Sequence, residues 1–262
     1  MNKTALITGA SSGLGAEFAK IYGAQGYNLV LVARRTNEML RIKDHIELTY
    51  GVDVLVITMD LTSADAPQRL FAETQRRNIH VDVLVNNAGF GALGKFMETD
   101  LEKQQNMVQL NVSALMSLTH HYLAPMVKKG RGQILNVASI AGFAPGPGMA
   151  VYYATKAFVL SFSDALSTEL KGTGVRVTAL CPGPVNTGFA GVAGFKNNIM
   201  FNGKADGKAA KVCRYGVKML EKGKAVAVPG MVCRAGAFAT RFVPREFAKW
   251  FIYKVQTSRI VK

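Results

Sequence analysis

The feature that most constrains the fold is a regular alternation of short apolar, β-branched runs with longer stretches of helical periodicity. The predicted strands are hydrophobic on both faces, as in strands buried between two layers of helices. They cover residues 4–8, 28–33, 53–58, 82–86, 133–138, 175–180 and 225–228. The predicted helices cover residues 13–25, 37–49, 64–78, 100–127, 152–171 and 204–222. This pattern predicts an α/β chain with one doubly wound, seven-stranded parallel sheet, which binds ligands beyond the carboxyl ends of its strands.

Composition excludes several other classes of protein. With 49% hydrophobic residues among 262, the chain can bury a substantial core, which argues against disorder. The three cysteines show no paired spacing and no histidine in ligand register, so we expect a reduced, cytoplasmic chain without disulfides or a metal site. The first predicted strand begins at Thr4, so we expect no signal peptide. The uncharged stretches 104–127 and 132–155 are too interrupted by polar residues to predict a membrane span.

A glycine-rich turn, TGASSGLG, follows the first predicted strand. Its glycines permit a tight turn and close backbone approach, and the helix behind it offers unpaired N–H groups to a pyrophosphate. An ordinary turn can have the same composition, but the position between a strand and a helix favours a dinucleotide site. The candidate cofactor residues of this turn are Gly9, Ser11, Ser12, Gly13, Leu14 and Gly15.

Two arginines, Arg34 and Arg35, follow the second predicted strand. NAD enzymes usually place an acid at this point, where it binds the ribose 2′-hydroxyl. Two guanidinium groups favour a 2′-phosphate instead. The alternative, a solvated helix start, would put positive charge where the helix dipole disfavours it. The sequence therefore predicts NADP(H) as the cofactor.

Polar residues also follow the third and fourth strands. Asp60, which precedes Leu61, could accept a hydrogen bond from an adenine amino group, or it could simply cap a helix. Asn87, Ala88 and Gly89 suit close packing against a ribose, although such turns also occur without ligands. We include all five residues among the candidate cofactor contacts.

A serine, two tyrosines and a lysine follow the fifth predicted strand. Ser139 lies at its carboxyl end, and the segment AVYYATKAF places Tyr152 and Lys156 four residues apart, on one helix face. Tyr153 lies three residues from the lysine and could also meet it, so spacing alone leaves the choice open. The structural alternative is a core tyrosine beside a snorkelling lysine.

The acid–base chemistry of tyrosine explains why a lysine and a serine would lie beside it. A free tyrosine has a pKa of about 10 and holds its proton too tightly to act as a base at neutral pH. An ammonium and an oxidised nicotinamide nearby would lower that pKa, and the phenol could then exchange a proton with an alcohol. A serine hydroxyl could hold the carbonyl oxygen meanwhile.

Together these motifs resemble those of the short-chain dehydrogenase/reductase family. The matching residues are Thr8-Gly9-x-x-x-Gly13-x-Gly15, Asn86-Asn87-Ala88-Gly89, Ser139, Tyr152-x-x-x-Lys156, and Pro182-Gly183 followed by Thr187. The resemblance covers residues 3–230 and implies a Rossmann fold. It also implies that the first tyrosine of the pattern, Tyr152, is the catalyst and that Tyr153 is a neighbour.

The resemblance implies further roles. Asn111 would bend its helix and hold a water that links the lysine to solvent; between Leu110 and Val112 it has no other evident purpose. The Pro182-Gly183 turn would position the nicotinamide, and Thr187 would meet its carboxamide. The helices at 100–127 and 152–171 resemble those that build the family's oligomers, so we expect a homodimer or homotetramer.

The C-terminal part of the chain is strongly basic. Residues 194–262 contain 15 Lys and Arg against 3 Asp and Glu, whereas the preceding 193 residues contain 17 against 14. We expect an NADP-binding and catalytic domain at 1–230, followed at 231–262 by a basic, aromatic extension of two short helices separated by Pro244. The extension could be a lid, a dimer contact or an amphipathic surface for an anionic membrane. Nucleic-acid binding fits its composition but not the catalytic set.

The sequence therefore predicts an NADP(H)-dependent oxidoreductase that interconverts a carbonyl and a secondary alcohol, with Asn111, Ser139, Tyr152 and Lys156 as catalytic residues. The apolar, glycine-rich segment 188–203, expected to cover the pocket, favours a lipophilic ketone such as a 3-oxoacyl chain or a steroid-like molecule. One alternative is a regulatory or scaffold protein that binds the cofactor without turnover. Another is a lipid-metabolism reductase at the membrane periphery.

Overall fold

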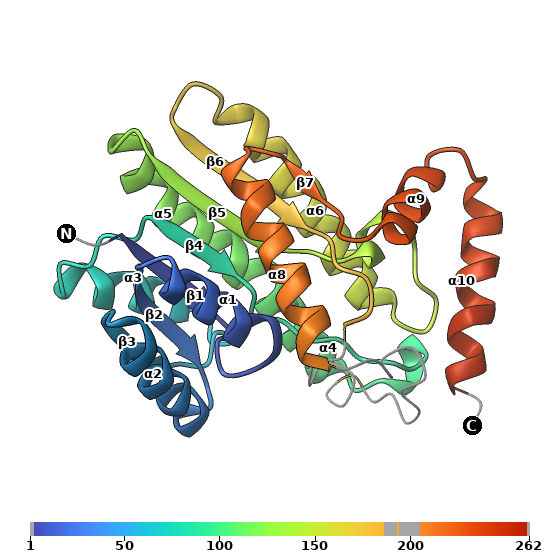
Figure 1. Ribbon diagram of the computed structural model, residues 1–262. Helices are drawn as coiled ribbons and strands as arrows, with labels where there is room; N and C mark the ends of the chain where they lie inside the picture. Colours follow the sequence, from blue (N-terminus) through green and yellow to red (C-terminus); the bar gives the residue numbers. More distant parts are fainter. Residues whose placement is uncertain (1–2, 186–192, 194–204, 261–262) are drawn as a thin grey trace.

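The computed structural model describes residues 3–185, 193 and 205–260. Its centre is a seven-stranded sheet in the order β3-β2-β1-β4-β5-β6-β7, with every neighbouring pair parallel (Figure 1). The strands are β1 (Thr4–Thr8), β2 (Asn28–Ala33), β3 (Val54–Thr58), β4 (Val83–Asn86), β5 (Gly132–Val137), β6 (Val175–Leu180) and β7 (Val226–Ala227). The predicted doubly wound Rossmann fold is confirmed.

Helices cover both faces of the sheet. They are α1 (Gly13–Ala24), α2 (Thr36–Tyr50), α3 (Ala66–Arg76), α4 (Leu101–Val108), α5 (Leu115–Lys128), α6 (Ala150–Glu169), α8 (Ala205–Glu221), α9 (Met231–Ala239) and α10 (Arg245–Ile260). The first layer consists of α1, α2 and α8, and the second of α3, α5 and α6 (Figure 1).

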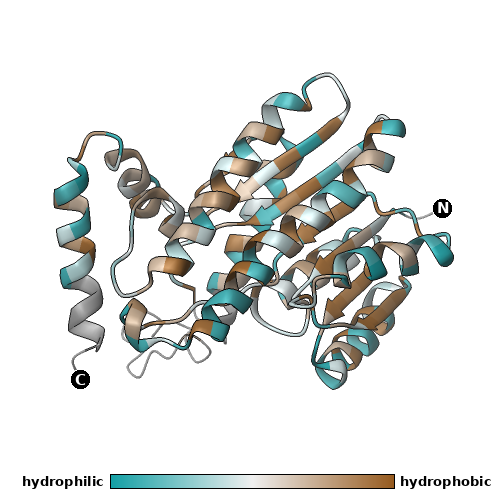
Figure 2. Ribbon diagram, turned by 180° about the vertical axis from the view of Figure 1, so that it is seen from behind, coloured by the Kyte–Doolittle hydropathy of each residue, from teal (hydrophilic) through white to brown (hydrophobic). Residues whose placement is uncertain are grey.

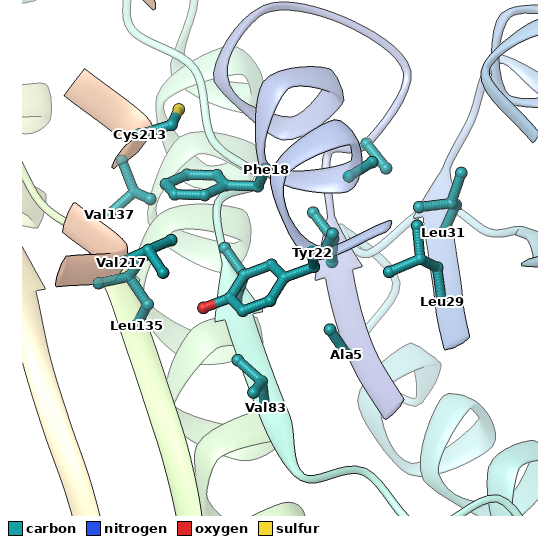
Figure 3. Packing of buried hydrophobic residues seen from close by; sticks show 14 of the residues in the cluster. Ala5, Phe18, Tyr22, Leu29, Leu31, Val83, Leu135, Val137, Cys213 and Val217 are labelled. Atoms are coloured by element: carbon teal, nitrogen blue, oxygen red, sulfur yellow. The ribbon is translucent and has the colours of Figure 1, made fainter. Parts of the chain in front are cut away.

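The strands are apolar along their length because both of their faces are covered (Figure 2). Leu6 in β1, for example, is fully buried and lies in register between Val30 of β2 and Leu84 of β4. On the α1 side, Phe18 and Tyr22 fill the space between that helix, the sheet and α8 (Figure 3). These two aromatic side chains fix the height of α1 above β1 and therefore the position of the turn that joins them.

The order of the strands indicates at which edge of the sheet a ligand can bind. The chain winds outward from β1 to β3 and then crosses back to β4, so β1 and β4 are neighbours at the point where winding reverses. A crevice opens at such a switch point beyond the carboxyl ends of the strands. The turns after β1, β4 and β5 all lie at this edge.

The predicted helix at 100–127 is interrupted in the structure. A π-helical segment, η2 (Gln109–Ala114), separates α4 from α5 and contains Asn111. Such single-turn bulges occur frequently at functional sites. Two short 3₁₀ helices that the sequence pattern did not predict, η1 (Phe96–Glu98) and η3 (Ile140–Phe143), follow β4 and β5.

The C-terminal extension forms two helices, α9 and α10, with Pro244 between them, as predicted. Cys233 and Ala237 pack α9 against a small core cluster beside η3. Helix α10 runs along the outside of the molecule, farther from the sheet (Figure 1). No helix among the described residues is long and apolar enough to cross a membrane.

Candidate active site

The turn after β1 brings the start of α1 very close to the backbone of β1. A methyl group on Gly15 would lie 2.2 Å from the carbonyl oxygen of Gly9 and 2.7 Å from Nδ2 of Asn87, so only glycine fits. Gly9 and Gly13 both have left-handed φ angles, 64° and 58°. No side chain among the described residues caps the first turn of α1, and its N–H groups remain available to an anion.

Arg35 lies directly against this turn. Its Nε and Nη2 donate hydrogen bonds of 3.2 and 3.1 Å to Oγ of Ser11, and Nη2 donates a 2.6 Å bond to Oγ of Ser12. Arg34 is more exposed and lies 3.6 Å from Asp60 in an ion pair. The structure thus brings together both predicted arginines and the two predicted serines at one end of the crevice.

The turn after β4 closes against the turn after β1. Nδ2 of Asn87 donates hydrogen bonds to the carbonyl oxygens of Thr8 (2.9 Å) and Gly9 (3.2 Å). Oγ1 of Thr8, in turn, accepts bonds from the backbone N–H groups of Asn87 and Ala88, each 3.0 Å long. Asn87 therefore orients the glycine-rich turn with its side chain, while Ala88 and Gly89 line the crevice with backbone.

The two residues predicted after β3 lie in different environments. Asp60 remains at the edge of the crevice, where Oδ1 accepts bonds from N (2.9 Å) and Oγ1 (2.8 Å) of Thr62. Burial raises its pKa, but the bonds from Thr62 and the charge of Arg34 outweigh that effect and hold the pKa below its ordinary value. The side chain of Leu61 is buried in the core, so only its backbone can face a ligand.

Ser139, Tyr152 and Lys156 converge beyond the carboxyl end of β5. The Tyr152 phenol is hydrogen-bonded with Ser139, and the Lys156 ammonium lies 5.8 Å from the centre of the Tyr152 ring. Nζ of Lys156 donates a 2.7 Å bond to the carbonyl oxygen of Val137, the last residue of β5. Ser139 Oγ accepts a 3.1 Å bond from the N–H of Ala141, which fixes the serine at the start of η3.

The expected lowering of the tyrosine pKa is not found. Burial raises the pKa of Tyr152 to about 12, and the hydrogen bond with Ser139 lowers it only in part. Burial also lowers the pKa of Lys156 to about 8. The sequence argument relied on an ammonium and on an oxidised nicotinamide. Of these two only the ammonium belongs to the chain, and the cost of placing a charge in a buried site is larger here.

Tyr153 lies in a different environment from Tyr152. The two rings are 6.2 Å apart and roughly perpendicular, and Tyr153 packs over the backbone of Gly146, where a methyl group would lie 2.3 Å from its ring. Tyr152 is buried in a cluster with Met107 and Met149, and Tyr153 is only partly buried at the edge of that cluster. Of the two tyrosines, Tyr152 is therefore the one placed beside Ser139 and Lys156.

Asn111 connects the β4 turn with α6. Its Oδ1 accepts a 3.1 Å bond from N of Phe90, and its Nδ2 donates to O of Phe90 (2.9 Å) and to Oγ1 of Thr155 (3.1 Å). The side chain is almost fully buried. The π-helical turn is consistent with the expected bend, and the residue ties together the two segments that border Lys156.

A small pocket adjoins the Tyr152 side chain. It is lined by Ala92, Gly94, Phe96, Thr99, Gln104, Met107, Met149, Ala150, Val151 and Tyr152. Most of these groups are apolar. The sequence analysis predicted that residues 188–203 cover the pocket. These residues lie outside the described part of the structure, except for Ala193, which is buried.

The turn after β6 lies next to the serine. The carbonyl oxygen of Pro182 accepts a 3.1 Å bond from the N–H of Ile140, immediately after Ser139. A methyl group on Gly183 would lie 2.6 Å from Sγ of Cys233, so α9 packs directly on this turn. Thr187 lies outside the described residues.

Sequence reasoning missed two residues of this site. Thr8 is buried and joins the β1 and β4 turns, although it was noted only as part of a motif. Thr155 accepts the bond from Asn111 and donates a 2.7 Å bond to the carbonyl oxygen of Tyr152. Its position between Tyr152 and Lys156 was the available signal, but a threonine in a helix has many other uses.

Metal ligation finds no support in the described part of the chain. No group of three or more His, Cys, Asp or Glu side chains there could hold a metal ion. The three cysteines are free thiols, two of them buried.

Comparison with known proteins agrees with this geometry. Residues 3–196 match the family model of the short chain dehydrogenases. The chain is 40% identical over 191 residues to a sulfoacetaldehyde reductase from Chromohalobacter salexigens, across 72% of this chain and 75% of that protein. It is 36% identical over 178 residues to a very-long-chain 3-oxoacyl-CoA reductase from Laccaria bicolor, across 67% of this chain but only 53% of that protein.

A solved structure gives the same result. The short-chain dehydrogenase from Sphingobium yanoikuyae in complex with NADPH superposes with a TM-score of 0.81 at 32% identity, covering 90% of this chain and 92% of that one. The chain therefore belongs to the short-chain dehydrogenase family of oxidoreductases.

Proposed function

We propose that the protein is an NADP(H)-dependent oxidoreductase that interconverts a ketone and a secondary alcohol. The observation that carries this proposal is the convergence of Ser139, Tyr152 and Lys156 beside a small pocket. A non-catalytic regulator would have no need to bury Tyr152 and Lys156 beside Ser139, because burial of each polar group costs desolvation energy.

Each side chain has a defined task. The bound nicotinamide supplies the chemistry of hydride exchange with the substrate carbon. Ser139 donates a hydrogen bond to the carbonyl oxygen and holds it beside Tyr152. The phenol gives its proton to the oxygen as the alcohol forms, and Lys156 steadies the negative charge left on the phenol. Burial raises the pKa of the phenol to about 12, so the phenol carries its proton at neutral pH, as a proton donor must.

The proposed preference for NADP over NAD rests on Arg35 and Arg34. Arg35 already lies against Ser11 and Ser12, where the ribose end of a dinucleotide on the glycine-rich turn would come. Its guanidinium can pair with a 2′-phosphate through two parallel bonds. The remaining proposed cofactor contacts are Gly9, Gly13, Leu14, Gly15, Asp60, Leu61, Asn87, Ala88, Gly89, Tyr152, Lys156, Pro182, Gly183 and Thr187.

The proposed substrate is a lipophilic ketone or 3-oxoacyl compound. The pocket beside Tyr152 is lined mainly by apolar groups, including Phe96, Met107 and Met149. One of the related proteins is named as a reductase of very-long-chain 3-oxoacyl-CoA, and another as a reductase of the short, polar sulfoacetaldehyde. Phe96, Met107 and Met149 favour an apolar substrate, whereas Thr99 and Gln104 bring polar atoms to the same lining, so the panel below includes both classes.

Assembly, domain limits and location are also proposals. Exposed apolar side chains on α4, α5 and α6, among them Val108, Met116 and Phe158, support a homodimer or homotetramer through these helices. We propose a catalytic domain at 1–230 with an extension at 231–262. We place the protein in the cytoplasm, at the periphery of a membrane.

The test is a panel of substrates with both cofactors. Purified full-length protein is mixed with NADPH or NADH and with ketones of increasing apolar size, 3-oxoacyl thioesters and sulfoacetaldehyde, and the loss of reduced-nicotinamide absorbance is followed. We expect turnover with NADPH that improves with apolar substrate size. NADPH binding without turnover on any carbonyl would support the non-catalytic alternative, and equal use of NADH would reject the cofactor preference.

A further inference from the structure

Helix α9 shows its larger apolar side chains to solvent. Cys233 and Ala237 face the protein core, whereas Met231 and Phe238, on the opposite face, are 85% and 60% exposed. Phe242, just beyond the end of the helix, continues this outer row, and its ring centre lies 5.2 Å from that of Phe238. The smaller residues of α9 are therefore turned inward and the larger ones outward.

Helix α10 has the same arrangement. Phe247, Trp250 and Phe251 are spaced three and four residues apart, so they share one face, and each exposes at least 50% of its surface. The rings of Phe247 and Trp250 have centres 5.7 Å apart, and the Lys254 ammonium lies over the Trp250 ring at 4.2 Å. Ile252 and Ala248, on the other side of the helix, are only partly exposed.

This orientation is the reverse of what a surface helix normally has. The apolar face of such a helix usually packs on the core and its polar face meets water. A contiguous exposed apolar face, in contrast, marks a surface that another body covers. The outer faces of α9 and α10, which we define as the docking face by Met231, Phe238, Phe242, Phe247, Trp250 and Phe251, therefore require an occupant.

Charge decides between the possible occupants. Residues 231–262 contain seven Lys and Arg and a single acid, Glu246, which already pairs with Lys249 at 2.6 Å. A two-fold interface between two copies would place this patch against itself and bring like charges together. An anionic lipid surface has the opposite charge, accepts aromatic side chains at the level of its headgroups, and attracts each nearby Lys or Arg.

Helix α10 passes near the active-site side of the molecule. Tyr253 of α10 lies close enough to Lys95 to contribute, after Glu98, to raising the pKa of that lysine. The neighbouring residues Phe96 and Met97 are themselves strongly exposed, and Phe96 lines the pocket beside Tyr152. Tyr253 lies on another side of α10 than Phe247, Trp250 and Phe251, so the docking face does not include this contact.

We propose that the docking face binds an anionic lipid bilayer, with its aromatic rings and Lys254 in the headgroup region, while the other basic side chains of the extension add attraction to the lipid phosphates. The two helices lie on the bilayer. This goes beyond the proposed reaction, because docking requires neither cofactor nor substrate.

The chain offers a built-in probe of this contact. Trp250 is its one tryptophan, so tryptophan emission reports on α10 alone. Full-length protein is mixed with vesicles of phosphatidylcholine, with or without phosphatidylglycerol, and is examined by fluorescence and co-sedimentation. We expect a blue shift and sedimentation with the anionic vesicles only. Both signals should be lost at about 1 M salt, where the screening length falls to roughly 3 Å.

Matched variants distinguish vesicle binding through the docking face from nonspecific adsorption of the protein to vesicles. Phe247→Ser removes one ring from the docking face and should weaken vesicle binding about tenfold. Leu48→Ser, at an even more exposed apolar residue on α2, should leave binding unchanged. Lys254→Gln, which removes the charge over the Trp250 ring, should weaken binding about fivefold, whereas Arg69→Gln, on α3, should not. Circular dichroism of each variant confirms that it is folded.

Three outcomes would overturn the proposal. One is the absence of binding to anionic vesicles at low salt, and another is equal loss of binding in Leu48→Ser and Phe247→Ser. The third is a change of oligomeric state in Phe247→Ser, measured by light scattering, in a protein that binds no vesicles. That last result would assign the docking face to a second copy of the chain. None of these readouts depends on turnover, so they remain valid if the proposed reaction fails.

Discussion

Nδ2 of Asn111, in the π-helical turn, donates a 3.1 Å hydrogen bond to Oγ1 of Thr155, one residue before Lys156. Both side chains are buried, and Thr155 passes the connection on to the carbonyl oxygen of Tyr152. A chain of hydrogen bonds thus runs from η2 into the turn of α6 that carries the proposed catalytic tyrosine. Thr155 acts as a positioning residue for that turn.

Thr155→Val should therefore lower kcat about tenfold while NADPH affinity stays within about twofold, because only the position of Tyr152 changes. Loss of one buried hydrogen bond should also reduce the free energy of unfolding by roughly 1–3 kcal/mol. Thr119→Val is the matched control, since Thr119 is equally buried and accepts a 3.0 Å bond from Asn86. It should lose similar stability in urea unfolding but keep kcat. Equal loss of kcat in both variants would reduce Thr155 to a structural role.

The neighbouring tyrosines provide a test of the proton donor. Tyr152→Phe removes only the hydroxyl and should lower kcat by about 10²–10⁴-fold, the usual contribution of a general acid, while NADPH still binds. Tyr153→Phe should retain most of the rate, because the Tyr153 ring packs over Gly146, whereas the Tyr152 phenol is the one hydrogen-bonded with Ser139. Steady-state kinetics and NADPH fluorescence titration measure the two effects. The reverse order of the variants would assign the chemistry to Tyr153.

The cofactor preference depends mainly on Arg35. Arg35→Ala should weaken NADPH binding by about ten- to a hundredfold, the value of a charge-assisted hydrogen bond, and should hardly affect NADH. Arg34→Ala should have a smaller effect, since its side chain is 72% exposed and its ion pair with Asp60 is long. Arg69→Ala on α3 is the control and should change neither affinity. An equal loss for NADPH and NADH in Arg35→Ala would mean that Arg35 only supports Ser11 and Ser12.

Lys156 gives the stability of the protein a predictable pH dependence. Burial lowers its pKa to about 8 from an ordinary value of 10.5, so between these values the unfolded chain holds a proton that the folded chain has lost. Stability from this residue is therefore complete above about pH 10.5 and is lost as the pH falls through 8.

The comparison with Lys156→Met isolates this effect. Relative to that variant, the wild-type protein without cofactor should gain about 2 kcal/mol in free energy of unfolding between about pH 7 and about pH 9.5. Urea unfolding at the two pH values measures it. Lys20→Met, on the surface of α1, should keep the wild-type pH dependence. If Lys156→Met and the wild type shift in parallel, the ammonium is not desolvated as the structure indicates.

The strands and the site turns were predictable because their signals are local. The β-branched runs appear in the structure within about a residue or two of their expected bounds, and the motifs after β1, β4 and β5 meet at one edge as the parallel order requires. The π-helical turn was not predictable from periodicity, because the apolar residues beside Asn111 continue an ordinary helical pattern. Only the bonds from Asn111 to Phe90 and Thr155 show why the helix widens there.

Two further properties depend on tertiary environment. Spacing showed that Tyr152 and Lys156 share a face but not that the site is closed to water, and burial reverses the expected direction of the tyrosine pKa. In the extension, Pro244 correctly indicated two helices. Amphipathic spacing could not reveal that Phe247 and Phe251 face outward, because the same spacing serves a helix packed on the core.

The contact between Gly183 and Cys233 bears on how this chain can change over evolutionary time. Because Sγ of Cys233 occupies the space where a side chain at position 183 would lie, the sequence at the end of β6 and the sequence of α9 constrain each other. A recombination that replaced everything after residue 230 would keep its function only if the incoming helix carried a small side chain at this point. We therefore expect homologues with a larger residue at position 183, in the turn after β6, to lack α9 or to place it elsewhere.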